Sequence, residues 1–164
     1  MRIIKRIEEL GYEFPEPPKP VGAYVPAIRI DDMVMTSGML PMKDGKLLYA
    51  KEIGGVFQNV ENGYKAAQLC TLNALAAINE IVSLDKIERI IRVTGYVNSA
   101  KSFTDQPKVI NGASDLLVEI FGESGKHVRA AIGVNELPLG ASVEVELTVL
   151  IKELHNKSKI YLGY

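Results

Sequence analysis

The stretch Val143-Glu144-Val145-Glu146-Leu147-Thr148-Val149 alternates without a break between apolar and polar side chains. Successive side chains of a β-strand point to opposite faces of its sheet, so this pattern predicts a strand with one buried face and one polar face. The apolar set is Val143, Val145, Leu147 and Val149, and the polar set is Ser142, Glu144, Glu146 and Thr148. We therefore expect a strand over residues 141–151 in a sheet that helices cover on one side.

A second strand is predicted directly upstream, over residues 128–134, with a short polar connection between the two. If that connection is a tight turn centred between Glu136 and Leu137, Arg129 lies directly opposite Glu144 and shares its face. A register shift of one residue would separate the two side chains. The pair is either a structural ion pair, or a site in which Arg129 binds a carboxylate and Glu144 holds or activates a water.

The rest of the chain supplies two helices, a third strand and a hairpin. Apolar residues recur at helical spacing from Asn59 to about Val82, and a second helix runs from Asp105 to Phe121 before Gly122. Strands are predicted over residues 22–30, 33–40 and 89–98, with a loop over residues 41–55. The resulting ββαβαββ order predicts an α+β fold of two layers, with two helices on one face of a mixed or antiparallel sheet.

The opposite face of that sheet is expected to carry Thr94, Tyr96, Arg129, Glu144 and Glu146 among apolar groups. Such a face is either solvated or buried against copies of the chain. The run Ala130-Ala131-Ile132 favours burial, so we expect an oligomer.

The N-terminal segment is predicted to be an arm rather than a separate domain. Ile3, Ile7 and Leu10 share one face of a short helix, and four prolines follow within Phe14–Pro20. We divide the chain into an arm packed on the domain (residues 1–21), the domain itself (residues 22–151) and a tail (residues 152–164). The pattern leaves open whether that tail docks.

Composition bounds the class of function. The chain has 164 residues, 47% of them hydrophobic, which is typical of one globular domain. Nineteen basic and twenty acidic residues give a formal charge of −1, which argues against a dedicated nucleic-acid binder. One cysteine excludes an intrachain disulfide, and no apolar stretch is long enough for a signal peptide or a membrane span. We expect a cytoplasmic protein with no membrane partner.

Three further positions are candidates for a site, each with a structural alternative. Ser37 and Gly38 end a predicted strand, where a glycine permits close approach of a ligand or forms a bulge. Tyr24 is either a hydrogen-bonding lid or a core aromatic residue. Asn111 is unusual inside a helix, although an exposed asparagine would also fit.

Other chemistries lack their signatures. His127 and His155 have no cysteine or carboxylate set at metal-ligand spacing, so we predict no metal site. Cys70 sits in an alanine-rich helix and is expected to be an inert core residue. Gly54-Gly55 lacks the remainder of a phosphate-binding motif, and no serine or cysteine has a recognisable nucleophile context. No cofactor is expected.

Taken together and in this order, these segments resemble the RidA (YjgF) family. The matching segments are Gly22-Ala23-Tyr24-Val25, Thr36-Ser37-Gly38-Met39-Leu40-Pro41, Val109-Ile110-Asn111, Val128-Arg129-Ala130-Ala131-Ile132, Glu136-Leu137-Pro138 and Val143-Glu144-Val145-Glu146. They span residues 22 to 150, and the proline-rich arm resembles a longer branch of the family.

The resemblance implies a chorismate-mutase-like fold, a homotrimer and small-molecule sites in the clefts between subunits. It also implies hydrolysis of reactive 2-imino or 2-enamino acids, released by pyridoxal-phosphate enzymes, to 2-keto acids and ammonia. By this resemblance Arg129 would bind the substrate carboxylate and Glu144 would position or deprotonate the attacking water. Tyr24 and Asn111 would line the cleft, together with Ser37, Gly38 and the backbone N–H of Ala131.

The sequence departs from the family pattern at two positions. Ala131 stands where many deaminating members have cysteine, and Met39 stands where glutamine is common. Two alternatives to a deaminase therefore stay open: a non-catalytic protein that binds a keto acid or another small carboxylate, and an endoribonuclease or translation inhibitor. The near-neutral charge disfavours the last of these.

Overall fold

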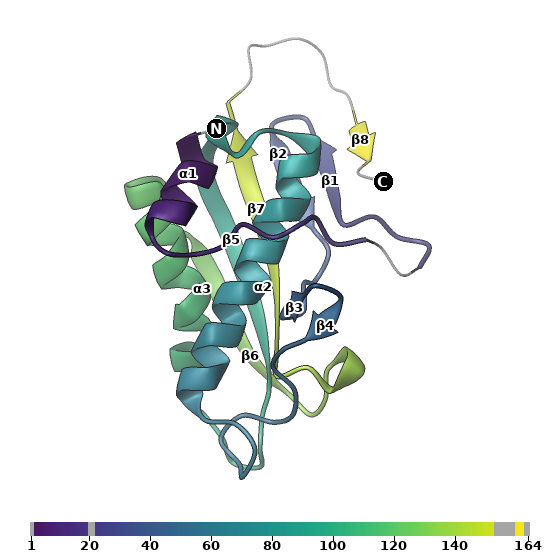
Figure 1. The fold of residues 1–164 in the computed structure, drawn as a ribbon, viewed down its shortest axis with the longest axis vertical. Coiled ribbons are helices and arrows are strands. Elements are labelled where there is room, and N and C mark those ends of the chain that lie inside the picture. The colour runs from purple at the N-terminus through teal and green to yellow at the C-terminus, as the bar shows by residue number, and fades with distance from the viewer. Residues whose placement is uncertain (1, 20–21, 153–159, 163–164) are drawn as a thin grey trace.

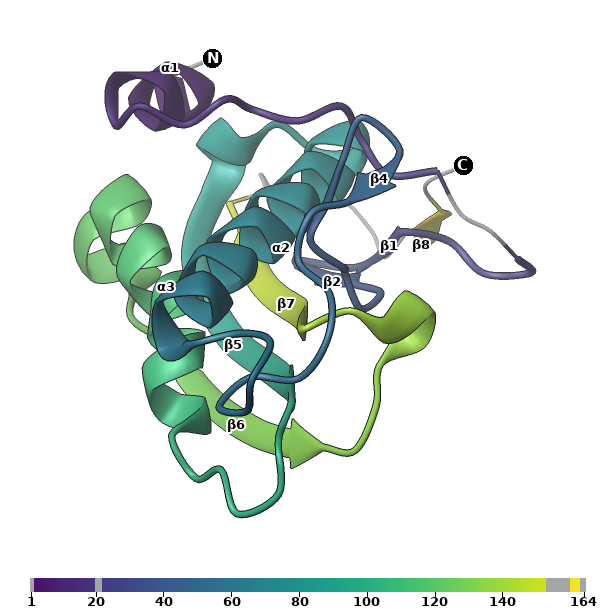
Figure 2. The ribbon, with the colours of Figure 1, turned by 60° about the horizontal axis from the view of Figure 1, so that its bottom comes forward.

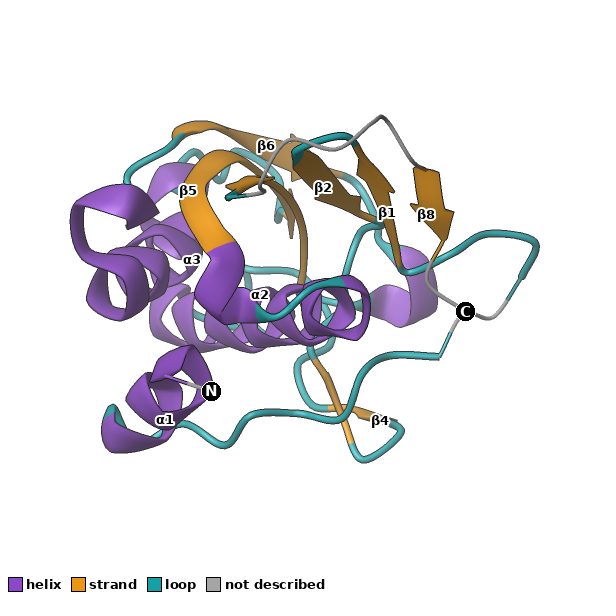
Figure 3. Ribbon diagram, turned by 90° about the horizontal axis from the view of Figure 1, so that it is seen from above, coloured by secondary structure: helices purple, strands orange, loops and turns teal. Residues whose placement is uncertain are grey.

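The computed structural model describes residues 2–19, 22–152 and 160–162, arranged as a layer of helices against a sheet (Figures 1 and 3). The helices are α1 (Arg2–Glu9), α2 (Val60–Ile81) and α3 (Gln106–Phe121), with 3₁₀ turns at Leu84–Lys86, Gly122–Gly125 and Pro138–Gly140. The strands are β1 (Ala27–Ile30), β2 (Met33–Thr36), β3 (Met42–Lys43), β4 (Lys46–Leu47), β5 (Ile87–Asn98), β6 (Val128–Val134), β7 (Val143–Ile151) and β8 (Ile160–Leu162).

The main sheet is mixed and has the order β6-β5-β7-β2-β1-β8. β5 and β6 are parallel, and the other neighbouring strands are antiparallel. The predicted α+β fold with two helices on one face is confirmed, as is the β1–β2 hairpin. The predicted loop over residues 41–55 contains a small β3–β4 hairpin around Asp44 and Gly45. Within the tail, β8 pairs with β1.

The predicted hairpin between the last two long strands is wrong, because β5 lies between β6 and β7. Val93 of β5 pairs with Arg129 on one side and with Leu147 on the other. The connection from β6 to β7 is no tight turn. It contains a 3₁₀ turn with Leu139 at a φ of 59°, and it crosses the end of β5 to reach the far side (Figure 2).

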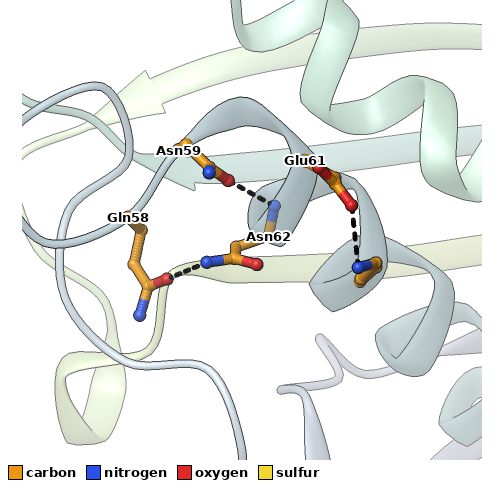
Figure 4. Close-up of polar contacts among 5 residues, drawn as sticks. Gln58, Asn59, Glu61 and Asn62 are labelled. Atoms are coloured by element: carbon orange, nitrogen blue, oxygen red, sulfur yellow. Dashed lines mark hydrogen bonds and ion pairs between the residues drawn. The ribbon is translucent and has the colours of Figure 1, made fainter.

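Helix α2 begins at a polar cap (Figure 4). Asn59 adopts an extended backbone, and its side-chain oxygen accepts a hydrogen bond of 2.8 Å from the backbone N–H of Asn62. Asn62 in turn donates to the side chain of Gln58 at 2.9 Å, and Lys65 pairs with Glu61 one turn along the helix. Such a cap satisfies N–H groups that have no partner within the helix, which fixes where α2 starts.

The core lies between the sheet and the two long helices. The apolar set of β7 is buried as predicted, and it faces a helix rich in alanine, which allows close approach. Helices α2 and α3 also pack closely at Gly112. A Cβ at this position would lie 2.9 Å from the backbone carbon of Tyr64 and closer still to its oxygen.

Helix α1 docks on the helical layer, and the chain after it runs across α2 towards the β3–β4 hairpin (Figure 2). Ile3 and Ile7 of α1 are buried in the core. The carboxylate of Asp85 accepts hydrogen bonds from the backbone N–H groups of Arg2 and Ile3, at 2.9 and 2.8 Å. Among the helices of the described residues, none is long and apolar enough to cross a membrane.

The second face of the sheet is covered by none of the helices in the described part of the chain (Figure 3). Its register places the polar set of β7 beside the outward residues of β5, which include Thr94 and Tyr96. Large apolar side chains on the same face are exposed, among them Met33, Met35 and Ile132. This outer face mixes carboxylates with exposed apolar groups, as predicted, except that Arg129 is not part of it.

Candidate functional site

Arg129 lies on the helix side of the edge strand β6. Its neighbour in the register is Val93, which is fully buried beneath the helices. The guanidinium donates from one terminal nitrogen to Ser114 Oγ at 3.1 Å and from the other to the Pro107 carbonyl at 3.3 Å. Both partners belong to α3, so this helix fixes the direction of the Arg129 side chain.

Asn111 lies on the same face of α3 as the two partners of Arg129. It follows Pro107 by four residues and precedes Ser114 by three, a spacing that aligns side chains along a helix. The structure thus brings Arg129 and Asn111 to one place, together with Ala131, which is two residues along β6 and shares the side of Arg129. We call Arg129, Asn111, Ser114 and Ala131 the arginine half-site.

Glu144 lies on the outer face of the sheet, directly beside Tyr96 of β5. The predicted contact between Glu144 and Arg129 is therefore wrong, because the two side chains are on opposite faces and β5 separates their strands. The error has two physical causes: the strand order differs from the chain order, and the single-turn register does not apply to strands that are not paired. Within one chain, the sheet therefore lies between the two groups.

Gly38 packs directly against the Glu144 carboxylate. A Cβ at position 38 would lie 2.8 Å from Glu144 Cδ and closer still to Oε1. The φ of Gly38 is not in the positive range, so close approach rather than backbone conformation accounts for the glycine. Met39 holds this segment in place through two backbone hydrogen bonds with Val145, at 2.8 and 3.0 Å.

Burial raises the pKa of Glu144, and the negative charge of Glu146 raises it further. The Tyr96 hydroxyl donates to Glu146 Oε1 at 3.4 Å, and the pKa of Tyr96 is raised by burial and by the same carboxylate. A carboxylate in these surroundings is a stronger base than one in water, which suits proton transfer from a bound water. We call Gly38, Tyr96, Glu144 and Glu146 the glutamate half-site.

Ser37 and Tyr24 flank the glutamate half-site in the sequence. The Ser37 hydroxyl donates to the Val25 carbonyl at 2.7 Å, and its backbone N–H donates to the Pro26 carbonyl at 2.8 Å. Ser37 therefore ties the end of β2 to the segment before β1. The Tyr24 ring is 55% exposed, so the alternative of a core aromatic residue does not describe it.

The remaining candidates from the sequence are metal ligands and Cys70, and of these His155 lies outside the described residues. No cluster of three or more potential metal ligands occurs among the described residues. Cys70 is buried, and burial raises the pKa of its thiol well above the usual value. A buried, protonated thiol is an inert core group.

Two residues of the arginine half-site region escaped prediction, Ser114 and His127. His127 Nε2 lies 2.9 Å from Ser114 Oγ, and His127 Nδ1 lies 2.6 Å from the Gly125 carbonyl oxygen. The signals were present but weak. His127 precedes Arg129 by two residues, as a neighbour on one side of a strand does, and Ser114 continues the helix face of Asn111.

Comparison with known proteins gives a consistent picture. The family model described as "YjgF/chorismate mutase-like, putative endoribonuclease" matches residues 5–153. Protein TCP17 of Trypanosoma cruzi is 36% identical over 157 residues, which cover 94% of this chain and 96% of that protein. The crystal structure of Atu1372 from Agrobacterium tumefaciens, a protein of unknown function, superimposes with a TM-score of 0.85 at 38% identity and covers 92% of each chain.

A more distant relative carries the name of an activity. A protein of Dermatophagoides farinae named 2-iminobutanoate/2-iminopropanoate deaminase is 27% identical over 138 residues, which cover 84% of this chain and 93% of that protein.

Proposed function

Because the chain belongs to the YjgF/chorismate mutase-like family, we propose that it hydrolyses reactive 2-imino or 2-enamino acids to 2-keto acids and ammonia. The observation that carries the proposal is the division of the site into two halves of complementary chemistry. The arginine half-site offers a cation held by two hydrogen bonds from its own terminal nitrogens. The glutamate half-site offers a base whose pKa is raised by burial.

The proposal includes an assembly in which the arginine half-site of one subunit meets the glutamate half-site of the next. Arg129 stands on an edge strand, and Glu144 stands on a sheet face that carries exposed Met33, Met35 and Ile132. An edge strand and an apolar sheet face are both surfaces that tend to be covered in an assembly. A closed ring of such unlike contacts, a homotrimer by the family resemblance, creates one complete site at each interface.

The chemistry needs no cofactor, because a protonated imine is already electrophilic. Arg129 binds the substrate carboxylate through its planar fork of donors, which fixes the position of the imine carbon. Glu144 takes a proton from water as the water oxygen adds to that carbon, giving a carbinolamine. Glu144 then passes the proton to nitrogen. As the C–N bond breaks, the C=O bond forms and the hydroxyl proton returns to Glu144, so that ammonia leaves with a 2-keto acid.

Ala131 in place of the family's frequent cysteine fits this scheme, because the scheme assigns no step to a thiol. The backbone N–H of a residue is unchanged when cysteine is replaced by alanine, so an anion contact at this position survives. A small substrate with a carboxylate is supported by the Arg129 guanidinium and by the small side chains of Ser114 and Ala131 on the same side.

The first test is ammonia release from freshly generated 2-iminobutyrate or 2-iminopropionate. We expect acceleration by the wild type and none by Arg129→Ala or Glu144→Gln. Binding of the product keto acid separates a deaminase from a carboxylate-binding protein. A deaminase loses turnover but keeps product binding in Glu144→Gln, whereas a binding protein shows no turnover even as wild type.

The second test addresses the shared site. Arg129→Ala and Glu144→Gln subunits, inactive alone, are unfolded together and refolded as mixed assemblies. Each intersubunit site draws its two halves independently, so random mixing restores about a quarter of the wild-type rate. If both groups served a site within one subunit, no mixed assembly would recover activity.

A further inference from the structure

A chain of hydrogen bonds runs from the backbone to the Arg129 guanidinium, and its direction is determined at every link. The Gly125 carbonyl can only accept, so His127 Nδ1, at 2.6 Å, must carry a proton. In a neutral imidazole the other nitrogen, Nε2, is then an acceptor. Ser114 Oγ, at 2.9 Å, must therefore donate its proton to His127.

The last link follows from the first two. Because the Ser114 hydroxyl proton points at His127, the oxygen lone pairs face away from it and are free to accept. The Arg129 guanidinium donates to this oxygen at 3.1 Å. The hydrogen-bond chain thus runs from the Gly125 carbonyl through the His127 ring and the Ser114 hydroxyl to the Arg129 guanidinium.

The surroundings keep the ring neutral, as the series requires. Burial lowers the pKa of His127, the hydrogen bond to Gly125 raises it, and the charge of Arg129 lowers it again, with a net fall. The unperturbed pKa of histidine is about 6.5, so the ring is uncharged at neutral pH.

We propose that Ser114 and His127 are positioning residues, which hold the Arg129 guanidinium in the orientation that takes a substrate carboxylate. The inference rests on the proposed role of Arg129 and adds the groups that orient it. Guanidinium groups have five N–H donors, and Ser114 and the Pro107 carbonyl use two of them within the described residues. The others stay available for the ligand.

His127 acts through Ser114 and does not contact Arg129 in this scheme. Without the imidazole acceptor, the Ser114 hydroxyl can rotate so that its proton points towards Arg129. The Ser114 oxygen is then no longer always oriented to accept a hydrogen bond from the guanidinium. A side chain as long as arginine has many rotamers, so the loss of one anchor spreads its end over several positions. Weaker carboxylate binding follows from this spread.

A spectroscopic test of the chain itself does not depend on catalysis. The chain has two histidines, so side-chain ¹⁵N NMR with His127→Gln assigns both. We expect His127 in the Nδ1–H form at neutral pH, with an Nε2 resonance that shifts in Ser114→Ala and stays in Ser114→Thr, which keeps the hydroxyl. If His127 is instead in the Nε2–H form, or if its Nε2 resonance does not change in Ser114→Ala, the inference is overturned.

A binding test connects the chain to function, with 2-oxobutyrate as the probe and calorimetry as the measurement. We expect Ser114→Ala and His127→Ala each to weaken binding by about threefold to tenfold, which is the range for the loss of one ordinary hydrogen bond. The double variant should lose no more than the larger single effect, because the two residues act in series. Ser114→Thr should retain most of the affinity, and Ser124→Ala, a half-buried serine beyond the end of α3, serves as the matched control.

The Arg129→Ala background separates the positioning role of Ser114 from the proposed role of Arg129 in carboxylate binding. If Arg129 binds the carboxylate, Ser114→Ala has no further effect in this background. Equal 2-oxobutyrate affinities of wild type and Arg129→Ala would overturn the proposed function, while the NMR result would still report on the hydrogen-bond chain. Additive losses in Ser114→Ala and Arg129→Ala would instead overturn the positioning role alone.

Discussion

Replacing Gly38 by alanine should remove most of the activity while leaving the fold intact. The added Cβ would lie 2.8 Å from Glu144 Cδ. Carbon atoms in favourable contact are about 3.5–4.0 Å apart, so the carboxylate must retreat by about 1 Å. The backbone at Gly38 suits alanine, because its φ is not in the positive range. The perturbation is therefore confined to the position of one carboxylate.

The size of the effect follows from that displacement. A misplacement of about 1 Å in a catalytic geometry can cost about 100-fold in rate. The cost in stability should be smaller than the usual 1–3 kcal/mol of an overpacked site, since a half-buried side chain can rotate away. We expect kcat/KM for 2-iminobutyrate hydrolysis to fall about 100-fold, with near wild-type affinity for 2-oxobutyrate.

Two comparisons make this prediction specific. In a Glu144→Asp background the shorter side chain leaves room for the Cβ, so Gly38→Ala should cost little further activity. Gly45→Ala is the matched control. An added Cβ there meets no atom within 4 Å, although the φ of +73° makes alanine mildly unfavourable. Wild-type kcat/KM in well-folded Gly38→Ala would refute the assignment of Glu144 as the base held against this glycine.

Three further predictions concern charge and packing. Glu144→Gln should raise the thermal midpoint at pH 8. The pKa of Glu144 is raised on folding, so the folded protein loses stability as the pH rises through that pKa, and glutamine carries no charge that would cause this loss. Asp85→Ala should destabilise the protein by about 0.5–2 kcal/mol in urea unfolding at pH 7. The difference should vanish in acid, because the pKa of Asp85 is lowered by the α1 N–H groups and its contribution is lost as pH falls through that value. Gly112→Ala should cost about 1–3 kcal/mol in the same assay, because its Cβ would press on the backbone of Tyr64.

The secondary structure and the buried faces could be predicted because each depends on local periodicity. The alternation in β7 identifies its buried face residue by residue, and the cap at Asn59 marks the start of α2. The candidate site residues Gly38 and Asn111 were selected in the sequence as residue types unusual for their positions, whereas Glu144 was selected through the pairing with Arg129 that the structure contradicts. Their roles remain predictions that the experiments above address.

The strand order could not be read from the same periodicity, because an alternating pattern indicates which face is buried and not which strand is adjacent. A better signal was present in the order of elements. The strand over residues 89–98, the helix over 105–121 and the strand over 128–134 form a β-α-β unit, and such a unit favours parallel pairing of its two strands. Parallel pairing of β5 with β6 leaves β7 to add on the other side of β5, which is the observed order.

The corrected order changes what the candidate site requires. With paired strands, Arg129 and Glu144 would neutralise each other in one chain, and a salt bridge would explain both residues without any ligand. Because the two side chains lie on opposite faces, they do not form an ion pair with each other. Each is held in place by a different part of the chain. Arg129 is held by α3, and Glu144 is pressed against Gly38. An anchored cation on an edge strand and a half-buried base on an apolar face are separately costly to maintain, and the proposed site between two subunits would use both groups.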